Sequence, residues 1–120
     1  MASVLVVDDE ELIRWSLAQT LEAAGYAVLE AGSARETLER LNEASDIDVV
    51  LLDLRLPDSS DLGLLRTLRQ RAPSCRIILM TAHGSADTLD EAIRAGAFRA
   101  LGKPFDMGKV VGIVREAAAA

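Results

Sequence analysis

The chain has 120 residues, half of them apolar, and a formal net charge of −6 at pH 7. This length allows one domain with a hydrophobic core and is too short for two domains. The acidic balance disfavours direct binding to nucleic acid, which needs a basic surface, and favours cations or a basic protein partner. No apolar run reaches the roughly 18 residues of a membrane span, and the first residues lack the basic region of a signal peptide. The single cysteine, Cys75, suits a reducing compartment, so we expect a cytoplasmic protein without membrane segments.

Apolar spacing predicts strands and helices in strict alternation along the chain. In chain order they are strand 3–7, helix 10–24, strand 26–30, helix 33–42, strand 48–52, helix 62–71, strand 76–80, helix 85–95, strand 98–102 and helix 106–117. The first helix is predicted from apolar residues at helical spacing, namely Leu12, Ile13, Leu17, Leu21 and Ala24. Gly25 is placed to end this helix, and Ser33 with Glu36 has the pattern of a capping box at the start of the second.

This alternation indicates a doubly wound α/β domain. Strands separated by helices are parallel and joined by right-handed crossovers. Because the strands are nearly continuous in Val, Ile and Leu, we expect helices to cover both faces of a five-stranded sheet. Such folds bind ligands outside the carboxyl ends of their strands.

Polar residues stand at the carboxyl ends of four predicted strands. Asp8 and Asp9 close the run SVLVVDD, and Asp53 closes the run IDVVLLD. Thr81 closes RIILMT, and Lys103 precedes Pro104 after FRALG. The fold would gather these side chains at one edge of the sheet, and the sequence therefore predicts an acidic site with one lysine.

Three aspartates at one edge predict a metal site. Carboxylates brought close together raise one another's pKa or require a cation. Mg²⁺ is the expected ion, because it binds through a few carboxylates and keeps several waters. Alternatively, Asp8 or Asp9 caps the first helix, but this role leaves Asp53 unexplained.

Asp53 is either a metal ligand only or also a nucleophile. Aspartate carboxylates form acyl phosphates, and phosphoryl transfer needs a metal ion and positive charge around the phosphoryl oxygens. Lys103 can supply that charge and Thr81 a hydroxyl donor. The alternatives are a structural ion pair for Lys103 and an ordinary strand-end role for Thr81. The bond before Pro104 is either trans or a cis bond that aims the lysine.

The segments VVDDE, DLRLP, TAHG and KPF, in this order, resemble the receiver domain of bacterial two-component response regulators. The resemblance covers essentially the whole chain, and it implies one receiver domain over 1–120 with the flavodoxin-like strand order 2-1-3-4-5. It implies that Asp53 is the phosphoacceptor for a sensor histidine kinase and that Thr81 and Lys103 engage the phosphoryl group. It also implies Mg²⁺ ligands at Asp9, Asp53 and the backbone carbonyl of Arg55, with Asp8 often acting through water.

The segments TAHGSADT and GAFRALGKPFD, with Trp15, are most similar to NtrC-type enhancer-binding activators. This likeness implies a phosphorylation-activated switch that controls transcription, with a possible homodimer. The ATPase and DNA-binding output domains of such regulators are expected to lie outside this chain. We expect Trp15 to pack on a face of the first helix.

The chain departs from the family pattern at two positions. Ala100 stands where receivers commonly have an aromatic residue, and Asp61 stands where they usually have glycine. The first departure leaves open an alternative, a constitutive protein-interaction receiver with weakened switching, whose output depends more on the segment 82–95 and the freedom of Gly84. Arg55 and His83 occupy positions that modulate phosphate lifetime in receivers.

A second rival is a hydrolase that turns over external phosphoesters through an aspartyl-phosphate. Such an enzyme generally needs a general acid beside its nucleophile. The residue two positions after Asp53 is Arg55, which cannot serve. We therefore expect no enzyme beyond the domain's own phosphotransfer and slow dephosphorylation.

Overall fold

The structure is a computed structural model that describes residues 2–44, 46–59, 62–82 and 86–120. Its elements are β1 (Ser3–Val7), α1 (Glu11–Ala23), β2 (Ala27–Ala31), α2 (Ala34–Glu43), β3 (Val49–Asp53), α3 (Gly63–Arg71), β4 (Arg76–Thr81), α4 (Ala86–Arg94), β5 (Arg99–Gly102) and α5 (Met107–Ala119). The sheet has the order β2-β1-β3-β4-β5, and every neighbouring pair is parallel. The predicted flavodoxin-like α/β fold is confirmed.

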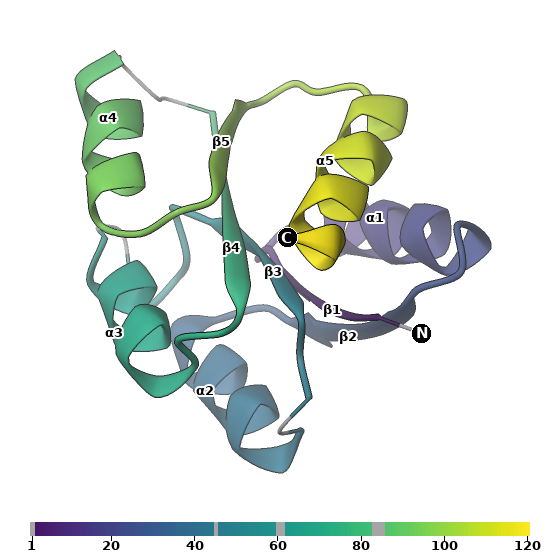
Figure 1. Ribbon diagram of the computed structural model, residues 1–120, viewed down its shortest axis with the longest axis horizontal. Helices are drawn as coiled ribbons and strands as arrows, with labels where there is room; N and C mark the ends of the chain where they lie inside the picture. Colours follow the sequence, from purple (N-terminus) through teal and green to yellow (C-terminus); the bar gives the residue numbers. More distant parts are fainter. Residues whose placement is uncertain (1, 45, 60–61, 83–85) are drawn as a thin grey trace.

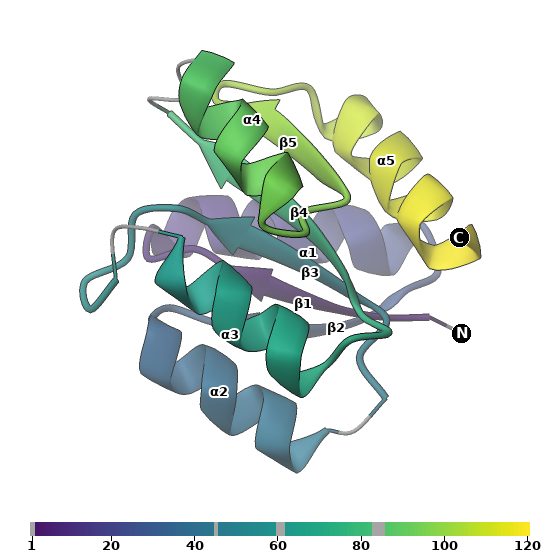
Figure 2. The same cartoon turned by 60° about the vertical axis from the view of Figure 1, so that its left-hand side comes forward.

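The sheet lies between two layers of helices. Helices α1 and α5 cover one face, and α2, α3 and α4 cover the other (Figures 1 and 2). All five residues of β3, at the centre of the sheet, are buried. This explains why the strand is almost entirely Val and Leu, since neither of its faces meets water.

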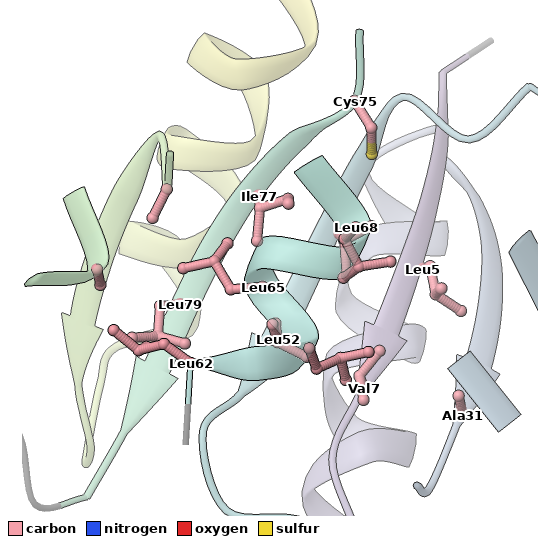
Figure 3. Close-up of a cluster of buried hydrophobic side chains, with 14 of the residues drawn as sticks. Leu5, Val7, Ala31, Leu52, Leu62, Leu65, Leu68, Cys75, Ile77 and Leu79 are labelled. Atoms are coloured by element: carbon pink, nitrogen blue, oxygen red, sulfur yellow. The ribbon is translucent and has the colours of Figure 1, made fainter. Parts of the chain in front are cut away.

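Each face of the sheet has its own hydrophobic core. On the α2–α4 face, Leu65 and Leu68 of α3 pack over strand residues that include Leu52, Ile77 and Leu79 (Figure 3). On the opposite face, side chains of α1 and α5 pack on the alternate strand residues, in a cluster that includes Val6, Leu17, Leu21, Leu51, Ile78, Met80, Val110 and Val114. Burial of each large aliphatic side chain contributes about 1.5–3 kcal/mol. These two cores hold the strand ends in fixed positions.

The predicted glycine at the end of α1 and the predicted capping serine of α2 are confirmed. Gly25 follows α1 with φ 98°, a left-handed backbone conformation that favours glycine. At the start of α2, Ser33 Oγ accepts a hydrogen bond from the backbone N–H of Glu36 at 3.1 Å. The Glu36 carboxylate accepts in return from the N–H of Gly32, at 2.6 Å, one residue earlier than the usual capping box.

The prediction for the surface of α1 was wrong at two residues. Leu12 is 74% exposed and Trp15 is 55% exposed, so neither packs into the core. The residues of α1 that point inward are Leu17, Ala18 and Leu21, which are buried, and Ile13, which is half-buried. Leu12 lies about 140° around the helix from Leu17, because each residue advances a helix by about 100°, and it therefore points to solvent.

Some predictions lie outside the described residues, namely those for Asp61, His83 and Gly84. Within the described ranges, none of the helices combines the length and the apolar character needed to cross a membrane.

Candidate functional site

The parallel strands bring the predicted site residues to one edge of the sheet. Val7 of β1 pairs with Leu52 of β3, so the residues that follow, Asp8 and Asp53, lie side by side. Asp53 is itself the last residue of β3 and pairs with Met80. The strand therefore extends one residue beyond its predicted end.

Three carboxylates gather at this edge. Asp8, Asp9 and Asp53 each offer one carboxylate oxygen, and these three oxygens lie within 4.8 Å of one another. Asp8 and Asp53 are buried, whereas Asp9 is exposed, so the group opens to solvent on one side. A set of oxygen donors only, partly accessible to water, fits a hard divalent cation that keeps some of its waters. The donor set therefore fits Mg²⁺.

Lys103 lies between the two buried carboxylates. Its Nζ donates to Asp8 Oδ2 at 2.9 Å and to Asp53 Oδ2 at 3.2 Å. Burial alone would lower the pKa of Lys103, but the hydrogen bond to Asp8 and the charge of Asp53 outweigh it, and the pKa is raised. The lysine is therefore charged at neutral pH. Three carboxylates, each of charge −1, and one ammonium group of charge +1 give the site a formal charge of −2, which one divalent cation balances.

Burial raises the pKa of Asp53 above its ordinary value. The nearby charge of Asp8 raises it further, while Lys103 and the N–H of Arg55 oppose the shift. Asp53 is thus a buried carboxylate only partly compensated by hydrogen bonds, which include one from Arg55 N to its Oδ1 at 3.2 Å. A bound metal ion, or a change in the covalent state of Asp53, would offset the unfavourable free energy of this buried carboxylate.

Asp8 is held by its neighbours on every side. Its Oδ1 accepts from the N–H of Glu10 at 2.9 Å, its Oδ2 accepts from Lys103, and its backbone carbonyl accepts from Arg14 at 2.8 Å. Arg14 is itself paired with Glu30 of β2 at 3.1 Å. Hydrogen bonds thus hold both carboxylate oxygens of Asp8 in place at the edge of the sheet.

The alternative that an aspartate caps α1 finds no support. The N-cap residue of α1 is Glu10, and no side chain caps this helix among the described residues. The hydrogen bond of Asp8 reaches Glu10 itself rather than the first helical turn. Both Asp8 and Asp9 are therefore available to the site.

Thr81 and Lys103 lie on neighbouring strand ends. Thr81 is the last residue of β4, pairs with Gly102 of β5 and is 2% exposed. Its backbone carbonyl accepts from the N–H of Lys103 at 2.7 Å. The peptide bond between Lys103 and Pro104 is cis. Both predicted phosphoryl-binding residues thus lie at the edge that carries Asp53.

The sequence did not indicate two features of the site. One is Arg14, whose hydrogen bond to the Asp8 carbonyl depends on where the tertiary fold places α1 relative to the end of β1. The other is a hollow of about 390 Å³ beside Lys103, walled by Ile13, Pro104 and Phe105 with Glu10 at one side. Helical spacing assigned Ile13 to the core, and no pattern distinguishes it from other core residues.

Comparison with known proteins agrees with this geometry. Residues 4–115 match the family model of the response regulator receiver domain. The chain is 40% identical over 114 residues to the DNA-binding transcriptional regulator NtrC of Escherichia coli K12, covering 95% of this chain and 24% of that protein. It is 42% identical to the response regulator protein PilR of Pseudomonas aeruginosa, covering 94% of this chain and 25% of the relative.

Solved structures give the same result over the whole fold. The beryllofluoride-activated NtrC4 receiver domain dimer matches with a TM-score of 0.92 at 35% identity, covering 99% of this chain and 98% of that one. A receiver domain protein from Clostridium thermocellum matches with a TM-score of 0.92 at 33% identity, covering 99% and 95%. The chain spans about a quarter of the length of the curated relatives it matches. The chain belongs to the response regulator receiver domain family.

Proposed function

We propose that this chain is a phosphorylation-activated switch of a two-component system, with Asp53 as the phosphoacceptor. The observation that carries the proposal is the position of Lys103, whose Nζ is shared between Asp8 and Asp53 beside the exposed Asp9. A cation and a divalent-ion donor set around one strand-end carboxylate are what phosphoryl transfer to that carboxylate requires.

In the proposed reaction a carboxylate oxygen of Asp53 attacks phosphorus in the phosphohistidine of a sensor kinase. An oxygen–phosphorus bond forms and the phosphorus–nitrogen bond breaks. The electron pair stays on the imidazole, which takes up a proton from solvent. Lys103 exchanges its hydrogen bond to Asp53 Oδ2 for one to a phosphoryl oxygen, and its hydrogen bond to Asp8 keeps the ammonium group in place. Thr81 offers its hydroxyl to another phosphoryl oxygen.

Asp9, Asp53 and the backbone carbonyl of Arg55 would hold Mg²⁺, with Asp8 acting through water. Bound there, the ion would neutralise charge on the phosphoryl group. The chain's own contribution is to hold the acceptor oxygen in place: Arg55 N and Lys103 each bind one oxygen of Asp53. This positioning lowers the reorganisation needed for reaction.

The phosphoryl group would shift the domain between two states by binding one of them more tightly. The proposed output is an ATPase and DNA-binding region. The resemblance to NtrC-type activators implies both parts, and the relative from Escherichia coli K12 is named a DNA-binding transcriptional regulator. Homodimerisation is part of the proposal, because the NtrC4 receiver was solved as a dimer. The constitutive interaction module is not favoured, because the acidic group and its lysine are complete although Ala100 replaces the aromatic residue.

We propose that the domain is no enzyme towards external substrates. Arg55, two positions after Asp53, cannot act as a general acid. Steady multiple turnover of a phosphoester substrate would contradict this part of the proposal.

Intact mass spectrometry after incubation with acetyl phosphate and Mg²⁺ tests the function. We expect one phosphoryl group on the wild-type chain and none on Asp53→Asn, which keeps the size of the side chain without its nucleophilic carboxylate. Chelation of Mg²⁺ should abolish the adduct on the wild type. An equal adduct on Asp53→Asn would refute the assignment of the phosphoacceptor.

A further inference from the structure

The segment that follows Asp53 is tied to the start of a distant helix by one side chain. Asp58 Oδ1 accepts from the backbone N–H of Ala34 at 2.7 Å, and Asp58 Oδ2 accepts from the N–H of Arg35 at 3.0 Å. These are first-turn groups of α2, whose N–H donors have no partner within the helix. Asp58 thus caps α2 from a segment 24 and 23 residues further along the chain.

The two bonds have the character of charge-assisted contacts. The N–H groups of Ala34 and Arg35 lower the pKa of Asp58 below its ordinary value. A carboxylate at a helix N-terminus also interacts favourably with the helix dipole. The Asp58 side chain is therefore an ionised clamp on α2 at neutral pH.

The turn that carries Asp58 is held in a fixed shape. The N–H of Leu56 donates to the carbonyl of Ser59 at 2.7 Å, and Ser59 N donates back to the carbonyl of Leu56 at 3.3 Å. Leu56 is buried in the core on the α2–α4 face. Asp58 lies near the tip of this turn. Its hydrogen bonds hold the turn against the start of α2, and the burial of Leu56 holds the turn against the hydrophobic core.

Arg55 lies between this turn and the sheet. On the sheet side, Leu54 N donates to the Met80 carbonyl at 3.0 Å, and Arg55 N donates to Asp53 Oδ1 at 3.2 Å. On the other side begins the turn that Asp58 holds. The position of the Arg55 backbone is therefore set from both ends, and one of these ends is anchored through α2.

We propose that Asp58 is a positioning residue for the metal site. By clamping the segment 54–59 to α2, it holds the backbone carbonyl of Arg55 beside the carboxylates of Asp9 and Asp53. The inference rests on the proposed function, in which this carbonyl is a Mg²⁺ ligand. It adds that α2, which provides no ligand, is part of the support of the site.

Ser33 offers a matched control, because it caps the same helix without bridging to the segment 54–59. Its Oγ accepts from the N–H of Glu36 within the first turn. Asp58→Ala and Ser33→Ala each remove one capping side chain from α2. Only Asp58→Ala also releases the segment that carries Arg55.

The test is titration of the 120-residue chain with Mg²⁺ alone, followed by the amide NMR shifts of the residues around Asp53. We expect Asp58→Ala to raise the Mg²⁺ dissociation constant about tenfold, the low end of what losing an outer partner of a metal ligand costs. Ser33→Ala is expected to leave the dissociation constant unchanged while lowering stability to urea as Asp58→Ala does. Asp58→Asn, which keeps one acceptor oxygen, should fall between wild type and Asp58→Ala.

The outcomes separate the inference from the proposed function. Equal Mg²⁺ affinity of wild type and Asp58→Ala would overturn the positioning role and leave the metal site standing. An equal loss in Ser33→Ala would show that stability of α2 matters rather than the clamp, which also overturns it. Absence of Mg²⁺ binding to the wild type would refute the metal site and this inference with it.

Discussion

Replacing Lys103 with methionine removes the only cation that contacts the two buried carboxylates among the described residues. Methionine keeps a flexible apolar side chain of similar length and has no charge. The Nζ lies 2.9 Å from Asp8 and 3.2 Å from Asp53, and the side chains of these aspartates are 0% and 7% exposed. The variant therefore leaves two neighbouring carboxylates buried without their partner.

The magnitude follows from the geometry. At about 3 Å and an effective dielectric constant of about 20, each contact has a gross Coulomb energy of about 5 kcal/mol. Desolvation of the ammonium group offsets much of this, and breaking a buried pair by removing one partner costs about 3–5 kcal/mol. Because the site opens to solvent at Asp9, we expect a loss of about 3 kcal/mol in the free energy of unfolding, the low end of that range.

The assay is urea unfolding at neutral pH without divalent cations. Arg35→Met is the matched control, because Arg35 pairs with Glu39 at 3.8 Å with side chains that are 83% and 49% exposed. That exposed pair should contribute less than about 1 kcal/mol. A loss for Lys103→Met no larger than for the control would refute the view that Lys103 compensates buried charge.

Two further measurements check the cause of the loss. In Lys103→Met the folded-state pKa of Asp53, which burial already raises, rises further above the unfolded value, so the folded state binds a proton at Asp53 more tightly. The stability deficit relative to wild type is therefore full at neutral pH and shrinks as the pH falls through this raised pKa. Mg²⁺ should also restore more stability to the variant than to the wild type. A stability deficit of Lys103→Met that changes with neither pH nor Mg²⁺ would contradict the electrostatic explanation.

Three other predictions follow from the same structure. Asp53→Asn should raise the free energy of unfolding without Mg²⁺, because the raised pKa of Asp53 means that its ionised carboxylate opposes folding at neutral pH. A lower stability of this variant to urea would contradict the prediction. Gly32→Ala places a methyl group 3.0 Å from Nη1 of Arg14, and it should cost about 1 kcal/mol and shift the amide NMR signals around Asp8, whose carbonyl Arg14 binds. Cys75 is 2% exposed with a pKa raised by burial to about 11, so a thiol reagent at neutral pH should modify it only after unfolding, and rapid modification of the folded chain would disprove its burial.

The fold and the gathering of the site could be predicted because both follow from short-range patterns. Strands of uninterrupted Val, Ile and Leu that alternate with helices leave few arrangements. In a parallel sheet the strands all end at one edge, so Asp8, Asp53 and Lys103 had to meet there. Their meeting needs no knowledge of side-chain packing.

Other features could not be predicted because they depend on contacts between distant segments. Helical spacing grouped Leu12 with the apolar residues of α1 that face the core. The stripe of α1 that is buried is too narrow to include Leu12. The clamp from Asp58 to α2 joins residues more than 20 positions apart, and an aspartate in a turn has no sequence mark that shows which helix it will cap. The contact of Arg14 with the Asp8 carbonyl is set by the same kind of tertiary packing.

The proposed switch depends on transfer of the phosphoryl group to Asp53. Reduction of the acetyl phosphate-treated chain with borohydride converts an aspartyl phosphate to homoserine, and peptide mass spectrometry then locates it. We expect homoserine at position 53 alone, and only when Mg²⁺ was present during phosphorylation. Homoserine at position 8 or 9, or its complete absence under conditions that give a phosphoryl adduct, would show that Asp53 is not the phosphoacceptor.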